Sequence, residues 1–400
     1  MRVLCVVDTF FPDVPGGMAR VAWDVAKALA ARGHQMALVA GDGNAHSRTA
    51  GVTEEVIDGV RVVRYPKPAM SAWDPWRAGK QIADCAAAIR NLHRQFSAEV
   101  MLCHSIFTVG AAAQACPDVP LLQTVHSPAI QEIIYNWQNQ GVAGRVNRIF
   151  GTSTVRALEL QCLRQSTALH ALSRYTVSQM EHEYSSSVTD YRVIPHWADT
   201  DWFRTVSKTE ARRELGWPQG DRIVFTVRQL RYRYGIDTAI QAIAPLAAKG
   251  ECRFFIGGSG ACRAALEAQI DRLSARDSVS MLGRLTDEHL RLAYQAADLF
   301  ILPTRELECF GLIILEALAC GLPVIGTTVG AIPENLSPIL PQYLVSPDDP
   351  EAMRRKVAAF LADELPGPGA EALIHYTRTR FGKDLIVSQY EQFIGSLCAS

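Results

Sequence analysis

Strand-like and helix-like segments alternate along the whole chain, and this alternation restricts the fold more than any other feature. The first half begins with a buried-strand pattern at Val3–Val7, a segment of helical periodicity at Ala19–Arg32 and a second apolar run at Met36–Ala40. The second half begins the same order again at Ile223–Val227. Because strands that alternate with helices pair in parallel, with helices on both faces, we predict an α/β fold of doubly wound parallel sheets.

An irregular stretch, residues 194–203, separates the two series of strands and helices. We place the boundary between two Rossmann-like domains there, which gives an N-terminal domain of residues 1–195 and a C-terminal domain of residues 196–380. A chain of 400 residues is long enough to bury two substantial cores. A final helix is expected at about residues 383–400.

The composition argues against several classes of protein. A net charge of −1 disfavours a nucleic-acid-binding protein, since such proteins rely on positive charge to contact phosphates. The ten cysteines are scattered without a Cys-x-x-Cys pair, which indicates reduced, buried thiols rather than a zinc site or disulfides. The N-terminal run is a strand closed by Asp8 rather than a secretion signal, and no segment is a candidate membrane span. We expect a cytoplasmic protein.

Two glutamates, Glu308 and Glu316, flank the start of an apolar, helix-forming run. The amides of Phe310, Gly311 and Leu312 are predicted to form the N-terminus of this helix, which attracts phosphate through unpaired N–H groups and the helix dipole. Glu316 can accept hydrogen bonds from ribose hydroxyls, and Glu308 from the hydroxyls of a sugar. The alternative is a capped helix with a solvated glutamate at each end, but the apolar run around Glu316 implies a half-buried carboxylate that needs partners.

The segment from Glu308 to Glu316 resembles the Glu-x7-Glu motif of family-4 glycosyltransferases, which are retaining enzymes with the GT-B fold. The resemblance extends over nearly the whole chain. It implies two Rossmann-like domains facing a central cleft, with a nucleotide diphosphate sugar bound mainly to the second domain and the acceptor bound to the first. It also implies that the final helix packs back on the first domain.

The resemblance implies a retaining, metal-independent glycosyltransferase of the hexosyltransferase type. Its donor would be a nucleotide diphosphate sugar, with UDP- and GDP-linked sugars favoured. Its acceptor would be a hydroxyl of a glycan, a lipid-linked intermediate or a small metabolite. No cofactor, metal ion or nucleic acid is expected. Retention is usually described as front-face attack, in which the leaving phosphate takes the acceptor's proton and no carboxylate nucleophile is needed.

A basic loop, Arg228 to Gly235, follows the first strand of the second domain. In the family an arginine and a lysine just before the glycine face the donor's pyrophosphate, where two positive charges neutralise the leaving group. This chain has Tyr234 before the glycine and no lysine in the loop. We favour Arg228 and Arg233 as the pair, with Arg231 pointing to solvent. The alternative is a solvated basic loop.

Glycines follow strands at two further places. Gly16 and Gly17 open the first helix, where the family places a loop against the donor's diphosphate or the acceptor, and an ordinary tight turn is the alternative. Gly258 and Gly260 follow a strand of the second domain and resemble the family's turn near the nucleoside. Arg284, after the next strand, fits the segment where backbone groups meet the base. We assign these five residues to donor binding.

His126 stands at the end of a first-domain strand and matches the family's strand-end histidine beside the transferred sugar. With Glu308, Arg228 and Arg233 it makes up the predicted catalytic set. His104 follows another first-domain strand in the same way, and we interpret it as structural.

Asp199 and Asp201 have the spacing of the Asp-x-Asp motif that holds a metal in the other glycosyltransferase fold. Here the pair falls in the hinge between the domains and is followed by Trp202 and Phe203, as in the family's hinge without metal. We therefore interpret it as structural and predict no metal site.

Residues 144–165 carry four arginines, with Glu159 as the opposing acid, and apolar residues are interleaved among them. The arginines are Arg145, Arg148, Arg156 and Arg164. A basic amphipathic segment of this kind can dock on an anionic membrane surface, which would place the protein peripherally on the inner face of a membrane. The alternative is an ordinary helix packed on the acceptor side.

Two other classes of function remain open from the sequence. One is another GT-B-fold enzyme, either a nucleotide-sugar epimerase or a phosphorylase, although no lysine follows a suitable glycine-rich strand to carry the pyridoxal of a phosphorylase. The other is a catalytically inactive protein that binds nucleotide sugars. The intact pair of Glu308 and Glu316 argues against inactivity, and the missing lysine keeps it open.

Overall fold

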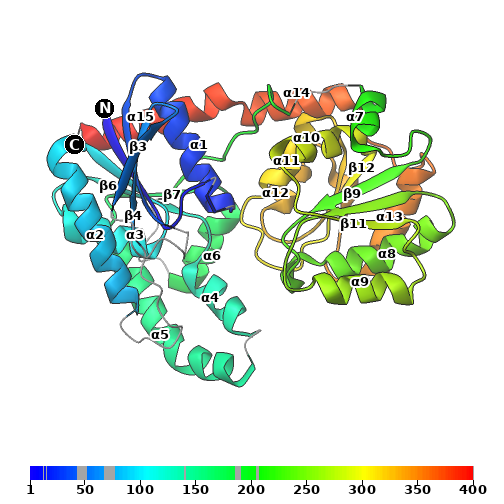
Figure 1. Ribbon diagram of the computed structural model, residues 1–400, viewed down its shortest axis with the longest axis horizontal. Coiled ribbons are helices and arrows are strands. Elements are labelled where there is room, and N and C mark those ends of the chain that lie inside the picture. The colour runs from blue at the N-terminus through cyan, green and yellow to red at the C-terminus, as the bar shows by residue number, and fades with distance from the viewer. Residues whose placement is uncertain are drawn as a thin grey trace. The chain divides into compact units, whose positions relative to one another are not determined.

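The computed structural model describes residues 1–11, 13–14, 16–42, 52–66, 77–138, 141–184, 191–203 and 207–399, with the backbone alone for residues 77–78, 136–138 and 141–150. The chain divides into two compact units (Figure 1). Unit 1 contains Met1–Pro195 and Ile386–Ser400, and unit 2 contains His196–Leu385.

Unit 1 is built on a sheet to which the described residues contribute eight strands, in the order β3-β4-β2-β1-β5-β6-β7-β8. β3 runs antiparallel to β4, and the other neighbours run parallel. The strands are β1 (Arg2–Val7), β2 (Gln35–Gly41), β3 (Thr53–Ile57), β4 (Val60–Tyr65), β5 (Val100–Cys103), β6 (Leu121–Val125), β7 (Ala168–Ala171) and β8 (Tyr191–Val193). The helices are α1 (Gly17–Ala31), α2 (Arg77–Phe96), α3 (Ile106–Ala115), α4 (Ala129–Gln138), α5 (Gly141–Gln165), α6 (Arg174–Tyr184) and α15 (Lys383–Cys398).

The sequence predicted the buried strands of unit 1 but missed the two strands at its edges, β3 and β8. Edge strands are covered less completely than central ones, so they need not form an apolar run. In β3, Val56 is 72% exposed and follows two exposed glutamates, Glu54 and Glu55. The pattern that revealed the central strands is therefore absent from the edges.

The core of unit 1 forms where the central strands meet α2 and α3. Leu4, Val39 and Met101 are fully buried, together with Ile89 of α2 and Val109 of α3. Fully burying an aliphatic side chain stabilises a fold by about 1.5–3 kcal/mol. These strands are apolar on both faces because helices cover both faces of a parallel sheet.

The last helix, α15, packs within unit 1. The Tyr390 hydroxyl lies 3.1 Å from Nε2 of His170, and the Tyr390 side chain is 3% exposed. Glu391 accepts a hydrogen bond from Arg32 at 2.9 Å and makes another with His34 at 2.8 Å. The C-terminal residues therefore supply both core and surface contacts to the N-terminal sheet.

Unit 2 contains a parallel sheet to which the described residues contribute six strands, in the order β11-β10-β9-β12-β13-β14. The strands are β9 (Ile223–Val227), β10 (Arg253–Gly257), β11 (Val279–Gly283), β12 (Leu299–Leu302), β13 (Val324–Thr327) and β14 (Leu344–Val345). The helices are α7 (Lys208–Leu215), α8 (Ile236–Ala248), α9 (Arg263–Arg272), α10 (Asp287–Ala296), α11 (Leu312–Ala319), α12 (Ile332–Leu336), α13 (Pro350–Leu361) and α14 (Ala370–Phe381). Figure 1 shows α8 and α9 on one face of the sheet and α10, α11 and α12 on the other.

The two units confirm the predicted α/β class, with one parallel sheet and one that is parallel except for its edge strand β3. No helix in the described part of the chain is long and apolar enough to cross a membrane. All ten cysteines lie among the described residues, and none forms a disulfide. Burial raises the pKa of the Cys5 thiol to about 12, so this group stays protonated and unreactive.

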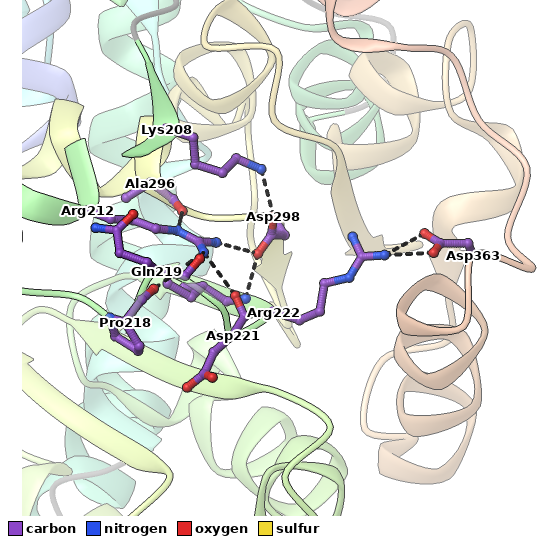
Figure 2. A network of polar contacts seen from close by, with 10 residues as sticks. Lys208, Arg212, Pro218, Gln219, Asp221, Arg222, Ala296, Asp298 and Asp363 are labelled. Carbon is purple, nitrogen blue, oxygen red and sulfur yellow. Dashed lines mark hydrogen bonds and ion pairs between the residues drawn. The ribbon is translucent and has the colours of Figure 1, made fainter. Parts of the chain in front are cut away.

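A buried arginine fixes the entry of the chain into unit 2 (Figure 2). The Arg212 side chain is 5% exposed, and its Nη2 donates to Oδ2 of Asp298 at 2.7 Å. Its remaining donors meet backbone carbonyls, including those of Ala296 at 2.9 Å and Gln219 at 2.8 Å. Asp298 also accepts from the Ile223 amide at 2.7 Å. The guanidinium thereby ties α7 to the first residues of β9 and to the residue that precedes β12.

Arg212→Ala should lower the free energy of unfolding by about 3 kcal/mol or more, because the substitution leaves a buried carboxylate without its main partner. Arg213→Ala is the matched control, since the neighbouring Arg213 side chain is 74% exposed. The control should change the free energy of unfolding by no more than about 0.5 kcal/mol. Denaturant unfolding of both variants checks this, and equal stabilities for the two would contradict a structural role for the Arg212 network.

Candidate active site

Two predicted site residues of unit 2 form an ion pair at the carboxyl edge of its sheet. Arg228 follows β9 and Glu308 lies in the loop after β12, and these strands are neighbours in the sheet. Nη2 of Arg228 donates to Oε2 of Glu308 and lies 3.4 Å from the hydroxyl oxygen of Thr304. The two charged side chains are only 13% and 10% exposed. The sequence did not predict that the proposed phosphate ligand and the proposed sugar ligand contact each other.

One hydrogen-bond donor of the buried Arg228–Glu308 pair has no acceptor among the described residues. Nε of Arg228 is buried and has no hydrogen-bond partner in the part of the chain that the structure describes. A buried donor without an acceptor costs about 1–3 kcal/mol. An oxygen atom supplied by a ligand at this position would satisfy it.

The two favoured arginines of the basic loop both lie against the ring of Tyr234. Cζ of Arg228 lies 4.2 Å from the ring centroid and Cζ of Arg233 lies 4.8 Å from it. Nη2 of Arg233 also donates to the Tyr234 hydroxyl at 2.8 Å. Arg231 is exposed, as the prediction for this residue required. Tyr234, which stands before the loop glycine in place of a lysine, is therefore part of the same cluster.

Arg305, which was not predicted from the sequence as a site residue, joins the Glu308 loop to the basic loop. Its side chain is 7% exposed and donates to both carboxylate oxygens of Asp237, at 2.6 and 2.7 Å, and to the carbonyl of Tyr232 at 2.9 Å. Its backbone amide donates to the carbonyl of Arg233 at 2.7 Å. The available signal was an arginine placed soon after an apolar strand, and nothing local in the sequence identified its partner, 68 residues away.

The structure gives Gly258 and Gly260 a packing role that the sequence did not predict. At Gly258, where φ is +120°, a Cβ atom would lie 1.8 Å from the carbonyl oxygen of Arg228. At Gly260 it would lie 2.5 Å from the carbonyl oxygen of Leu230. The missing side chains let the turn after β10 touch the basic loop, and backbone hydrogen bonds join them, as from Arg228 to the Gly257 carbonyl at 3.1 Å. Direct contact of these glycines with a donor stays a prediction.

Helix α11 places the second glutamate on its buried side. The Glu316 side chain is 7% exposed and accepts a hydrogen bond from the Tyr294 hydroxyl at 3.0 Å. Gly311 precedes the helix with φ of +83°. Glu308 is also buried, at 8% exposure, so the alternative of a solvated glutamate at each end of a capped helix is wrong.

Three other residues of the predicted donor site are placed as follows. Phe310 is buried and its carbonyl accepts from Nδ2 of Asn335. Leu312 is the first residue of α11, so its amide lies in the first turn of the helix. Arg284 is exposed on the loop after β11.

In unit 1 the structure brings together the two strand-end histidines, His104 and His126. His104 follows β5 and His126 follows β6, and these strands are paired. Nδ1 of His104 lies 3.0 Å from Nε2 of His126. His104 is 4% exposed, and its ring is stacked on that of His126 with a centroid distance of 5.3 Å. Adjacent parallel strands therefore bring both histidines to one edge of the sheet, and the interpretation of His104 as structural stays a prediction.

The glycine pair of unit 1 borders open space. Gly16 precedes α1 and Gly17 is its first residue, and a Cβ atom at either position would have no atom within 4 Å among the described residues. Packing within the described chain therefore does not require glycine here. Pro15, the residue before the pair, lies outside the described residues.

The basic segment at residues 144–165 belongs to α5. Arg145 and Arg148 fall among side chains outside the described residues, whereas Arg156 and Arg164 are exposed. Glu159 does not oppose these charges at the surface: it is 1% exposed and accepts hydrogen bonds from the amides of the first two residues of α4, at 2.7 and 3.1 Å. Burial raises the pKa of this carboxyl group. The described half of α5 therefore packs on the unit 1 core.

The hinge aspartates make local contacts. Oδ1 of Asp199 accepts hydrogen bonds from the amides of Asp201 at 3.2 Å and Trp202 at 3.0 Å. These bonds close a turn. Among the described residues, no three or more His, Cys, Asp or Glu side chains are grouped so as to hold a metal ion.

Residues 15–202 match the family described as "Glycosyltransferase Family 4", and residues 207–380 match "Glycosyl transferases group 1". Two parallel α/β units with these matches, in this order, define a glycosyltransferase of the GT-B fold. The chain belongs to the family-4 glycosyltransferases, as the Glu308–Glu316 segment indicated.

Relatives and solved structures agree with this assignment. The chain is 28% identical to D-inositol 3-phosphate glycosyltransferase of Segniliparus rotundus over 267 residues, which are 65% of this chain and 58% of that relative. Sucrose-phosphate synthase from Thermosynechococcus elongatus has a similar structure, with a TM-score of 0.83 at 21% identity over 100% of both chains. HepE from Anabaena, solved in complex with UDP and glucose, gives a TM-score of 0.77 at 18% identity over 99% of this chain and 100% of its own. At these identities the structures show the shared fold.

Arg228→Ala and Arg233→Ala should each cost about 2–4 kcal/mol of transition-state stabilisation, as expected when a preorganised donor to a leaving group is removed. Arg231→Ala removes an exposed charge from the same loop and is the matched control. Kinetic measurements of kcat/KM, with denaturant unfolding to verify the fold, check this. Near-wild-type turnover in both site variants would show that the phosphate site is misplaced.

Substitutions of Glu308 and Glu316 should affect different steps, turnover and donor binding respectively. Glu308→Gln keeps the shape of the side chain but removes the charge that faces Arg228, so it should lower turnover more than donor affinity. Glu316→Ala should mainly weaken donor binding, because the bonding of the ribose changes little during transfer. Glu316→Gln is the control that keeps an acceptor for Tyr294. Donor dissociation constants and single-turnover rates decide this: if Glu308→Gln binds donor weakly but turns over normally at saturation, its catalytic role should be dropped.

Proposed function

We propose that the protein is a retaining, metal-independent transferase that moves a sugar from a nucleotide diphosphate sugar to a hydroxyl group. The observation that carries this proposal is that Arg228 and Arg233 both lie against the ring of Tyr234, and that Arg228 pairs with the buried Glu308. Two guanidinium groups fixed at the carboxyl edge of a parallel sheet suit the diphosphate of a nucleotide sugar, because parallel α/β sheets bind ligands at this edge.

The donor's leaving group would be held by positive charge from the protein. Arg228 offers its unsatisfied Nε and Arg233 offers a second guanidinium to the diphosphate. The N-terminus of α11, opened by Gly311, adds backbone N–H groups and the positive end of the helix dipole. Glu316 would accept hydrogen bonds from the ribose. UDP in the structure of HepE supports a uridine diphosphate donor as the first to test.

Transfer would break the bond between the sugar's anomeric carbon and the phosphate oxygen, and a new bond to the acceptor oxygen would form on the same face. The acceptor's proton would pass to the departing phosphate oxygen, so no carboxylate nucleophile is required. The ion pair between Glu308 and Arg228 supports this mechanism, since a carboxylate held by a guanidinium is a weak nucleophile. Glu308 would instead balance positive charge that develops at the sugar ring.

The acceptor would bind to unit 1. The open space beside Gly16 and Gly17 and the hydrogen-bonded pair of His126 and His104 supply room and polar groups for a hydroxyl-bearing molecule. The D-inositol 3-phosphate glycosyltransferase among the relatives supports a small polyol or its phosphate as one acceptor class. Peripheral contact of α5 with a membrane would serve a lipid-linked acceptor, and the exposed Arg156 and Arg164 support it.

A thermal-shift panel of UDP-, GDP-, ADP- and dTDP-linked sugars, each with and without EDTA, tests the proposal. A donor at a hundred times its dissociation constant should stabilise the protein by about 2.7 kcal/mol. The shift and the transfer activity should survive EDTA, because arginines and a helix N-terminus neutralise the diphosphate. Strict dependence of transfer on manganese or magnesium would contradict the metal-independent mechanism. If a donor binds but is neither transferred nor slowly hydrolysed, the result would favour an inactive nucleotide-sugar-binding protein.

A further inference from the structure

The Tyr234 ring occupies a central position among the charges of the donor site. Its face lies 4.2 Å from Cζ of Arg228, and its hydroxyl accepts a hydrogen bond from Arg233 at 2.8 Å. One side chain thus contacts both arginines through two different kinds of interaction. Tyr232, two residues earlier, is 56% exposed and its ring lies on Arg305 instead, 4.3 Å from Cζ.

The backbone that carries Tyr234 is fixed on both sides. Arg305 donates its amide to the carbonyl of Arg233 at 2.7 Å. Gly235 follows with φ of +65°, and a Cβ atom there would lie 2.0 Å from the carbonyl oxygen of Pro303, so the loop is pressed against the chain after β12. The backbone that carries the ring is therefore held by contacts within unit 2.

Two guanidinium groups on one loop repel each other until an anion binds between them. Glu308 offsets the charge of Arg228. An aromatic face attracts a guanidinium, and a hydroxyl oxygen accepts one of its hydrogen bonds, without adding a positive charge. A lysine at this position would add a further positive charge beside Arg228 and Arg233, whereas tyrosine contacts both arginines without adding one.

We propose that Tyr234 is a positioning residue that holds Arg228 by its ring and Arg233 by its hydroxyl, so that both guanidinium groups are oriented toward the donor's diphosphate before the donor binds. This inference rests on the proposed assignment of the two arginines to the diphosphate. Tyr234 stands where the family has a lysine, and the inference gives it a different function. A lysine would offer the diphosphate one ammonium group, whereas Tyr234 orients the two planar guanidinium groups of Arg228 and Arg233.

The test measures the dissociation constant of UDP by titration calorimetry, with GDP and ADP as the next probes if the thermal-shift panel favours them. Tyr234→Leu removes both interactions and should weaken binding about tenfold, which corresponds to cation–π and hydrogen-bond contributions of ordinary size. Tyr234→Phe keeps the ring and should weaken binding about threefold. Tyr232→Leu is the matched control, since it removes a ring from the same turn, and should leave the constant within twofold.

A double-mutant cycle separates positioning from a merely structural role. If Tyr234 acts through Arg228, Tyr234→Leu should weaken UDP binding much less in an Arg228→Ala background than in the wild-type protein. An equal loss in both backgrounds, or no loss in the wild type, overturns the inference. If Tyr234→Leu does not fold, Tyr234→Phe decides: a threefold loss that disappears in an Arg233→Ala background supports the inference, and an unchanged constant overturns it. If Arg228→Ala and Arg233→Ala themselves leave UDP binding unchanged, the proposed diphosphate site has failed instead.

Discussion

The buried guanidinium of Arg305 is the constraint on which the geometry of the candidate active site depends. It lies on the loop that carries Glu308, yet its hydrogen bonds go to Asp237, at the start of α8, and to the backbone of the basic loop. A buried charge needs close pairing, and moving the loops after β9 and β12 apart would break the hydrogen bonds of Arg305 to Asp237 and to the Tyr232 carbonyl, although its ion pair with Asp348 would remain. The relative position of Arg228 and Glu308 follows from this connection.

Close backbone contact also holds the turn after β10 against the basic loop. The turn after β10 reaches the basic loop because Gly258 and Gly260 lack side chains. Three loops from neighbouring strands thereby form one rigid edge, which is the arrangement that electrostatic catalysis requires, since preorganised charges do not reorganise as the leaving group departs. Gly258 and Gly260, which the family resemblance assigned to ligand contact, thus have a structural role in unit 2.

The sequence predicted the fold well where burial imposes a pattern, and it offered candidate site residues where a single segment carries the signal. The central strands are apolar on both faces and were recognised, whereas β3 and β8 at the sheet edges were not. Glu308 and Glu316 were found together because they are neighbours in the chain. The contact of His104 with His126 spans 22 residues and that of Arg228 with Glu308 spans 80, so these pairs follow from strand order and could not be derived from local pattern.

The division of the chain affects how the protein must be made. Unit 1 is interrupted after Pro195 and resumes only at Ile386, so the whole of unit 2 is an insertion within it. The hydrogen bond between Arg32 and Glu391 joins residues 359 positions apart. A ribosome therefore finishes unit 2 before it supplies the helix that covers His170 with Tyr390. The N-terminal sheet is synthesised first but completed last, and a chain that ends early would release it with part of its core uncovered.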